Sequence, residues 1–305
     1  MPSIVESQTP QKTTNTVSPF CLTLSEKFSP LGNTPDLYIA LGEAMAAPAE
    51  GIAKGGDLNQ PCDLFGQKWL PLNFLLSTNA DTPRAASQAE ALAQRLIQSG
   101  VNVNAKDSKG NTPLHYLGAS TKNAQLLLSK GAKVNVRNQN GNTPLHNVFG
   151  QKTAAVIKLL IDRGAQVNAR DKEQMTPLHF AANSGKADIT QLLIRNGADI
   201  NARSNQNWTP LHYGASHPEV TKKLIQAGAN LTIQNRQGAV IHSNSLEPGV
   251  LKLLLDRRVN VNLRNLQGQT PLHVHRFQPA LVKLLLAQKA QVNLRDAQCQ
   301  KLEGC

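Results

Sequence analysis

The tetrapeptide Thr-Pro-Leu-His is the feature of this sequence that most limits its possible folds. It occurs five times, at 112–115, 143–146, 176–179, 209–212 and 270–273. The first four copies start 31 or 33 residues apart, and a looser copy, AVIH at 239–242, lies between the last two. A fixed period of roughly 20–50 residues is typical of repeat proteins, in which each repeat forms one small structural unit. The period therefore predicts an array of stacked units rather than a single compact core.

A second element completes each period. It has the form Gly-Ala-x-Val-Asn, as in GAQVN at 164–168 and GADIN at 197–201, and it follows an apolar stretch such as ITQLLIRNG at 189–197. The Pro of the tetrapeptide suits the first turn of a helix, because its φ is already helical and its missing N–H has no helical partner there. The apolar stretch predicts a second helix that ends at the Gly. We expect the motif Leu to lie in the core and the motif His to bond the backbone of the neighbouring turn.

These residues resemble the ankyrin repeat, whose unit is a hairpin followed by two antiparallel helices that open with T-P-L-H. The resemblance implies an all-α repeat solenoid, with helix-turn-helix units joined by β-hairpin-like loops. It also implies that the motif residues are structural. These are Thr112, Pro113, Leu114, His115, Thr143, Pro144, Leu145, His146, Thr176, Pro177, Leu178, His179, Thr209, Pro210, Leu211, His212, Thr270, Pro271, Leu272 and His273.

The repeat pattern divides the chain into four regions. Residues 1–35, rich in Ser, Thr and Pro, are expected to be a disordered tail. Residues 36–68 are interpreted as a degenerate N-terminal capping repeat, and 69–298 as an array of about seven ankyrin repeats. The first of these carries an insertion near 77–86. Residues 299–305 repeat the start of a unit and then stop, which fits either a poor cap or a truncated sequence.

Within the first repeat of the array the motif is blurred. LPLN at 70–73 stands in the place of TPLH, and AEALAQRLIQSG at 89–100 predicts a second helix. In three later units Pro218, Pro248 and Pro279 predict the first residue of a second helix after a shortened loop.

Two hairpins depart from the pattern at their turns. Gln174 and Asn207 stand where other units have a turn Gly, and we expect these two hairpins to be loosened or reshaped.

Composition limits the class of protein and its location. The chain has four cysteines without C-x-x-C spacing, which indicates neither a zinc site nor a disulfide framework and favours a reducing, cytoplasmic compartment. No apolar stretch approaches the ~18 residues of a membrane span. The N-terminus lacks the apolar segment of a secretory signal. Delivery into another cell stays open as an alternative.

Catalysis and metal binding are not expected. Six of the eight histidines occupy the fourth motif position, one per unit, and repeated positions about 10 Å apart cannot share one zinc ion. The sequence contains no nucleophile elbow, phosphate loop, dinucleotide fingerprint or H-E-x-x-H motif. We therefore expect no enzyme activity, no cofactor and no metal.

The variable positions around the motif are the candidates for binding. In the ankyrin family partners bind along the hairpin tips and the exposed face of the first helices, which implies candidate roles for the residues just before the Thr and just after the His. Trp208 is unusual there, and it either packs on Met175 as a structural contact or forms an apolar-aromatic patch with Met175, Phe180 and Tyr213. Tyr116 occupies the same position as Tyr213 in an earlier unit. Aromatic residues are enriched among interface hot spots.

The charge of the chain adds a second candidate feature. Residues 1–99 carry a net −3, whereas 100–305 hold twenty-six Lys or Arg against eleven Asp or Glu, a net +15. A basic column recurs two residues after the Val-Asn Asn, and Arg137, Arg203 and Arg264 lack a following Asp. This excess favours a scaffold that binds a protein with an acidic surface, and we expect the chain to be a monomer. The alternative is a basic array that binds nucleic acid or an acidic lipid surface, although nucleic acid is less favoured because no interleaved aromatic-basic track is present.

Overall fold

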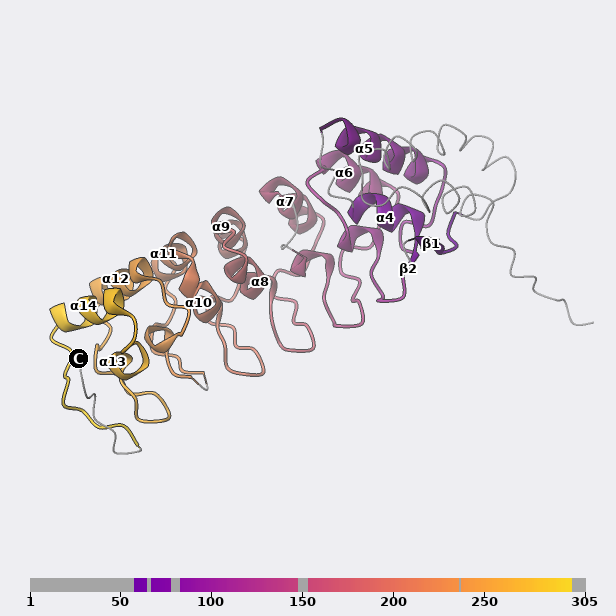
Figure 1. Cartoon of the computed structure of the whole chain (residues 1–305). Helices are drawn as coiled ribbons and strands as arrows, with labels where there is room; N and C mark the ends of the chain where they lie inside the picture. The colour runs from indigo at the N-terminus through magenta and orange to yellow at the C-terminus, as the bar shows by residue number, and fades with distance from the viewer. Residues whose placement is uncertain (1–57, 65–66, 78–82, 148–152, 236, 298–305) are drawn as a thin grey trace, which may run out of the picture. The chain divides into compact units, whose positions relative to one another are not determined.

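The computed structural model describes residues 58–64, 67–77, 83–147, 153–235 and 237–297 (Figure 1). The chain forms two compact units, residues 1–101 and 102–305, and each is described here by itself. The predicted tail at 1–35, most of the predicted capping repeat at 36–68, part of the insertion near 77–86 and the segment 299–305 lie outside the described residues. The boundaries proposed for these regions therefore stay predictions.

The first unit contains a hairpin followed by two helices. Strands β1 (Cys62–Leu64) and β2 (Gln67–Trp69) pair antiparallel, with Cys62 opposite Trp69. Helix α4 (Pro71–Ser77) begins at the Pro of LPLN, and α5 (Pro83–Gln98) begins before the predicted 89–100 segment. The blurred motif thus forms the same hairpin, helix and helix that the clearer motifs predict.

One cysteine differs from the expectation. Cys62 is fully buried and disulfide-bonded, so the expectation of a chain without disulfides is wrong at this position. Because disulfides form and persist in oxidising environments, this bond removes the cysteine argument for a reducing compartment.

The second unit is a series of short helices joined by hairpin-like loops, and Figure 1 shows the loops following one another along one side. In order they are η1 (Pro113–His115), α6 (Thr121–Ser129), η2 (Pro144–His146), α7 (Ala154–Asp162), α8 (Pro177–Asn183), α9 (Ala187–Arg195), α10 (Pro210–Tyr213), η3 (Gly214–Ser216), α11 (Pro218–Gln226), η4 (Val240–His242), α12 (Pro248–Asp256), α13 (Pro271–Val274) and α14 (Pro279–Ala287). Apart from β1 and β2, every regular element of the described residues is a helix, and the predicted all-α repeat solenoid is confirmed. Pro218, Pro248 and Pro279 begin α11, α12 and α14, as predicted.

The first helix of most units is shorter than the repeat pattern suggests. Among the first helices of residues 102–297, only α8 reaches seven residues, whereas η1, η2, η4, α10 and α13 each contain three or four. The strong helix formers Ala181 and Ala182 extend α8, while Gly118 follows η1 and Gly214 caps α10. The motif therefore fixes one helical turn, and the residues after it decide whether the helix continues.

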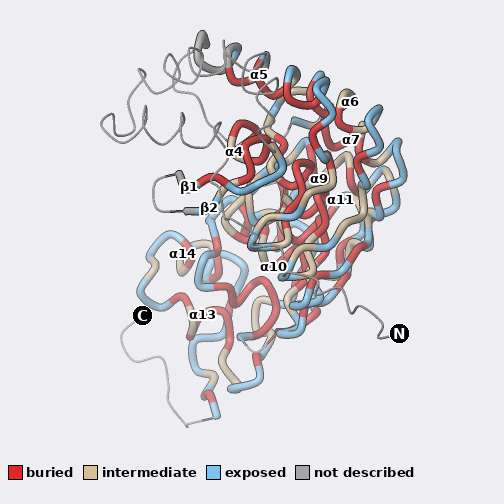
Figure 2. Tube along the Cα trace, turned by 90° about the vertical axis from the view of Figure 1, so that its right-hand side faces the viewer, coloured by how far each residue is buried: buried red, intermediate tan, exposed pale blue. Residues whose placement is uncertain are grey.

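The core runs along the array. The Leu of every Thr-Pro-Leu-His is at most 1% exposed, and Leu127, Leu160, Leu193 and Leu285 of the second helices are fully buried. Figure 2 shows buried backbone inside the second unit and exposed backbone at its loops. Each unit buries its apolar side chains against its neighbours, so the stability of one unit depends on the adjacent units.

The Asn that ends each Val-Asn pair joins neighbouring units. Asn104 donates from Nδ2 to the Gly131 carbonyl at 3.0 Å and accepts at Oδ1 from the Lys133 N–H at 2.8 Å. Asn135 and Asn168 make the same two bonds one and two units later. These bonds satisfy backbone groups at the end of the second helix.

The turns without glycine keep their shape, so the expected loosening is wrong. Gln174 and Asn207 adopt φ of 60° and 63°, the left-handed region that Gly110 adopts at 75°. Their N–H groups donate to the Asp171 and Ser204 carbonyls at 3.1 and 2.9 Å, which closes the turn as in the other hairpins. Left-handed conformation costs a residue with a Cβ roughly 1–2 kcal/mol, so the neighbouring contacts hold these turns in place.

No helix of the described residues is long and apolar enough to cross a membrane.

Candidate functional site

Four of the five TPLH histidines join their repeat to the next. The backbone N–H of the motif Thr donates to His Nδ1, at 3.0 Å between Thr176 and His179. Nε2 then lies 3.0 Å from the Trp208 carbonyl of the next hairpin. His115, His146 and His212 make the equivalent contacts with the carbonyls of Asn142, Met175 and Gly238 at 3.1, 3.3 and 3.2 Å. The expected bond from the imidazole to the neighbouring turn is confirmed in these four repeats, whereas Nε2 of His273 has no partner among the described residues.

Both contacts require neutral histidine. Nδ1 accepts from the Thr N–H, so Nε2 carries the proton that the next carbonyl accepts. Burial lowers the pKa of His146, His179 and His212 to about 4, because a charged ring would lose its hydration in the core. These rings are part of the framework. Among the described residues no group of three or more His, Cys, Asp or Glu is arranged to hold a metal ion.

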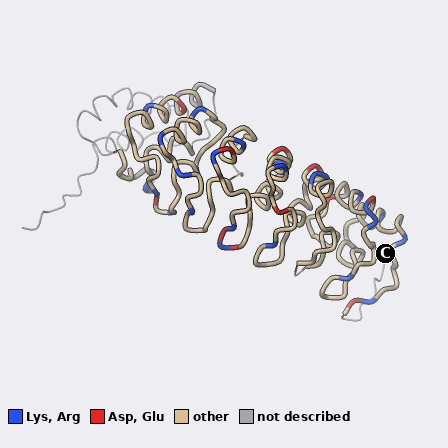
Figure 3. The backbone as a smooth tube through the Cα atoms, turned by 180° about the vertical axis from the view of Figure 1, so that it is seen from behind, with Lys and Arg blue, Asp and Glu red and all other residues tan. Residues whose placement is uncertain are grey.

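The basic column also has a structural role that the sequence did not reveal. Arg137 donates to the Gly141 carbonyl of its own hairpin at 3.0 Å and to the Arg170 carbonyl of the next. Arg264 donates to the Gly268 carbonyl at 2.8 Å and to the Arg295 carbonyl at 2.7 Å. Arg170 reaches the Arg203 carbonyl at 3.0 Å in the same way. The column thus links successive hairpins, and Figure 3 shows Lys or Arg on several hairpin loops of the second unit.

Arg203 is the exception in this column. Its side chain is exposed and makes no hydrogen bond or ion pair with any described residue. In its place Asn207 donates to the Gln234 carbonyl, at 3.5 Å. Arg203 therefore keeps all of its N–H groups for a partner, whereas Nη1 of Arg137 and of Arg264 is held by two carbonyls within the array.

Trp208 lies on the same hairpin as Arg203 and belongs to a small cluster. Its ring centroid is 5.1 Å from that of Tyr213, and the Tyr213 hydroxyl donates to the Met175 sulfur at 3.6 Å. All three side chains are half-buried. We call Met175, Trp208 and Tyr213 the aromatic cluster. Trp208 also lies 5.9 Å from the ring of His212, so one side of the indole is supported by the framework.

Two further candidates lie apart from the cluster. Phe180 packs edge-on against His146 of the preceding unit, with ring centroids 5.5 Å apart. The Tyr116 hydroxyl donates to Asp107 at 2.6 Å and accepts from Asn111 at 2.9 Å, both in its own hairpin. Burial, reinforced by the bond to Asp107, raises the Tyr116 pKa to about 12. The structure brings together Met175, Trp208 and Tyr213, and it gives Tyr116 contacts within its own unit.

The fold and these surfaces define a class of protein. Hairpin, helix and helix units, joined by buried histidines and presenting side chains on successive hairpins, form a repeat scaffold. A family model described as ankyrin repeats in three copies matches residues 84–171 and 147–235. The crystal structure of the human ASB11 ankyrin repeat domain is 26% identical, covering 72% of this chain and 97% of that chain with a TM-score of 0.62.

The chain therefore belongs to the ankyrin-repeat family. Ankyrin repeats are typically non-catalytic and generally serve as scaffolds for protein–protein interaction. A comparison with curated protein sequences gives no significant match.

Proposed function

We propose that this protein is a non-catalytic scaffold that binds another protein through the aromatic cluster and Arg203. The observation that carries the proposal is the difference between Arg203 and the other arginines of its column. Arg203 alone among Arg137, Arg170, Arg203 and Arg264 makes no bond to the next hairpin, and it shares its hairpin with Trp208. An available cation beside half-exposed aromatic side chains suits a protein segment that presents an apolar residue next to a carboxylate.

The charge of the repeats supports a partner with an acidic surface. Residues 100–305 carry a net +15, and the described residues contain only two ion pairs, Lys158–Asp162 and Arg170–Asp199. Most of the positive charge is therefore available for long-range attraction, which speeds encounter with an acidic partner. No part of the proposal requires a cofactor or a metal, and the protein acts as a monomer.

The alternative is a basic array that binds nucleic acid or an acidic lipid surface. The bonded arginines count against it, because Nη1 of Arg137, Arg170 and Arg264 is held at carbonyl oxygens, which restricts how their remaining N–H groups can reach a phosphate. A titration from 50 to 500 mM salt separates the two functions. Nucleic-acid binding should fall by orders of magnitude along a log-linear slope, whereas binding anchored by Trp208 should fall far less.

Photo-crosslinking tests the surface directly. Benzoylphenylalanine at Gln206, on the exposed hairpin of Trp208, should crosslink one protein in lysate of the source cells, and Trp208→Ala in the same chain should abolish that crosslink. Benzoylphenylalanine at Lys222, exposed on α11, is the matched control and should capture nothing specific. Equal capture from both positions would contradict the proposed surface.

A further inference from the structure

The fifth hairpin of the second unit is one residue shorter than its neighbours. In the other hairpins the closing bond joins residues four apart, as in Ser204 N–H to the Trp208 carbonyl at 2.9 Å and Asn265 N–H to the Gln269 carbonyl at 2.9 Å. Here Asn235 N–H donates to the Gly238 carbonyl, three residues on, at 3.0 Å. The position that carries Met175 or Trp208 in other units is thus held by a glycine without a side chain.

Gly238 is required by its surroundings. It adopts φ of 123°, and a Cβ added there would lie 2.7 Å from Asn265 Cβ and 2.9 Å from His242 Nδ1. Ala239 also replaces the motif Thr, and His242 Nδ1 is buried with no hydrogen-bond partner among the described residues. This repeat therefore differs from its neighbours in the length of its hairpin, in the missing side chain at Gly238 and in one imidazole nitrogen, Nδ1 of His242, that has no partner in the described part of the chain.

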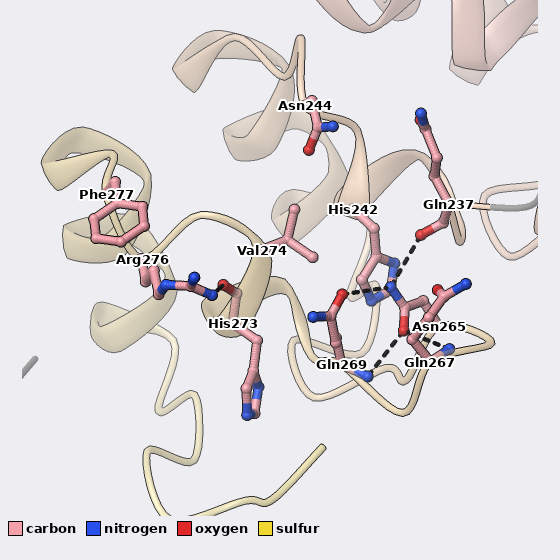
Figure 4. A pocket seen from close by; sticks show the side chains of 10 residues that line it. All are labelled: Gln237, His242, Asn244, Asn265, Gln267, Gln269, His273, Val274, Arg276 and Phe277. Carbon is pink, nitrogen blue, oxygen red and sulfur yellow. Dashed lines mark hydrogen bonds between the residues drawn. The ribbon is translucent and has the colours of Figure 1, made fainter. Parts of the chain in front are cut away.

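A pocket of about 340 Å³ lies next to this hairpin (Figure 4). It is lined by Gln237, His242, Asn244, Asn265, Gln267, Gln269, His273, Val274, Arg276 and Phe277. This volume is at the small end of the range for ligand sites, ~300–1,000 Å³, which suits one or two residues of a peptide better than a large cofactor.

The polar groups of the pocket differ in whether they are available. Asn265 is buried and fully bonded, since it donates to the Gln237 carbonyl and the Gln269 side chain and accepts from the Gln267 and Gln269 N–H groups. In contrast, the side chains of Gln237 and Asn244 are exposed and make no hydrogen bond with any described residue. Gln237 lies on the hairpin, and Asn244 follows η4 of the same repeat. A carboxamide both donates and accepts, so this pair matches the alternating groups of an extended main chain.

The rim of the pocket adds apolar surface and positive charge. Phe277 is 83% exposed, and the Arg276 guanidinium lies 4.7 Å from the centre of its ring. Arg276 donates one bond to the His273 carbonyl at 3.3 Å, which leaves its other N–H groups for a ligand. The lining includes this one cation and no carboxylate.

We propose that this pocket binds an extended peptide segment of the protein partner, with a bulky apolar side chain against Val274 and Phe277 and a neighbouring carboxylate on Arg276. The inference rests on the proposed function, because it supplies a second contact for the same class of partner. The two sites are linked through His212, whose ring lies 5.9 Å from that of Trp208 and whose Nε2 contacts the Gly238 carbonyl. A partner that binds across successive hairpins would contact Trp208 on one hairpin and then the pocket beside Gly238, which has no side chain, on the next.

A phage-displayed library of random 12-residue peptides tests this site. The library is first depleted on the Phe277→Ser variant and then selected on the intact chain. Enriched peptides should share a bulky apolar residue beside Asp or Glu. As synthetic fluorescent peptides, they should bind Phe277→Ser and Arg276→Gln at least tenfold more weakly than the unmodified chain. Leu266→Ser is the matched control, because Leu266 is 71% exposed but lies outside the pocket lining, and its effect should stay below twofold.

Three results would overturn the proposal. They are selection of no peptide after depletion, equal binding to Phe277→Ser and the unmodified chain, and binding of adenosine monophosphate at the pocket in place of peptide. Circular dichroism melting of each variant shows whether the fold is retained. A crosslinked partner that depends on Trp208 but not on Phe277 or Arg276 would leave the proposed function standing and refute the pocket alone.

Discussion

The buried histidines make the stability of the array depend on pH. Burial lowers the pKa of His146, His179 and His212 from 6.5 to about 4 in the folded chain. Between these values the unfolded chain binds more protons than the folded chain, so the free energy of unfolding falls as the pH falls. The stability from these residues is fully present above about pH 6.5 and is lost progressively towards about pH 4. Burial also lowers the pKa of His242 and His275, which adds to the loss.

The size of the effect follows from the pKa difference. One pKa unit corresponds to about 1.4 kcal/mol, so at pH 5 each of the three rings should reduce the free energy of unfolding by about 2 kcal/mol. Three rings together should remove about 6 kcal/mol, which is comparable with the whole stability of a typical domain, ~5–15 kcal/mol. We therefore expect the array to be much less stable at pH 5 than at pH 7.5.

Urea unfolding at pH 7.5 and pH 5.0, followed by circular dichroism, measures this loss. In His179→Gln the difference between the two free energies should shrink by about 2 kcal/mol, because one titrating ring is gone. The control is His217→Gln, since the His217 ring lies at the surface, bonded to the Asn183 carbonyl at 3.1 Å. A chain equally stable at both pH values, or an unchanged pH dependence in His179→Gln, would refute the reasoning.

Three further predictions concern other parts of the structure. Arg264→Ala should lower the free energy of unfolding by about 1 kcal/mol, because it breaks one bond within its hairpin and one to the next hairpin. Arg203→Ala should change the free energy of unfolding by less than ~0.5 kcal/mol. Equal effects in urea titrations would contradict the assigned contacts. Lys289→Gly should raise the melting temperature by a few degrees, because Lys289 holds a left-handed φ of 62°, which glycine adopts without strain. A lower melting temperature would show that contacts of the Lys side chain outweigh the strain of this backbone conformation. Cys62 should resist alkylation until the denatured chain is reduced, as judged by mass spectrometry, and alkylation without reductant would contradict the disulfide.

The repeated motif made the framework predictable. Three features depend on local geometry that recurs with the motif: Pro at the start of a helix, Leu in the core and His bonded to the next hairpin. The TPLH motif was therefore sufficient to predict them. The left-handed turns at Gln174 and Asn207 were misjudged, because local preference there is outweighed by contacts with neighbouring units.

The candidate site was less predictable, because it depends on distances between units. Arg137, Arg203 and Arg264 look alike in the sequence, and only the position of the next carbonyl shows that two are bonded and one is available. The pocket near Gly238 has a signal in the sequence. The segment NRQGA at 235–239 is one residue shorter than its counterparts, and its consequence appears only when the adjacent hairpins are placed.

The central claim is that the aromatic cluster is a binding surface rather than a structural contact. The measurement that tests it is the melting temperature and the affinity for the crosslinked partner, taken on the same sample of Trp208→Ala. The matched control is Asn142→Ala, because Asn142 occupies the same position in another hairpin and its carbonyl, which the substitution retains, accepts the bond from His115. The account predicts that Trp208→Ala weakens binding by roughly 30- to 1,000-fold, a hot-spot loss, with little change in melting, and that Asn142→Ala changes neither. A large fall in melting temperature with unchanged affinity per folded molecule would contradict it.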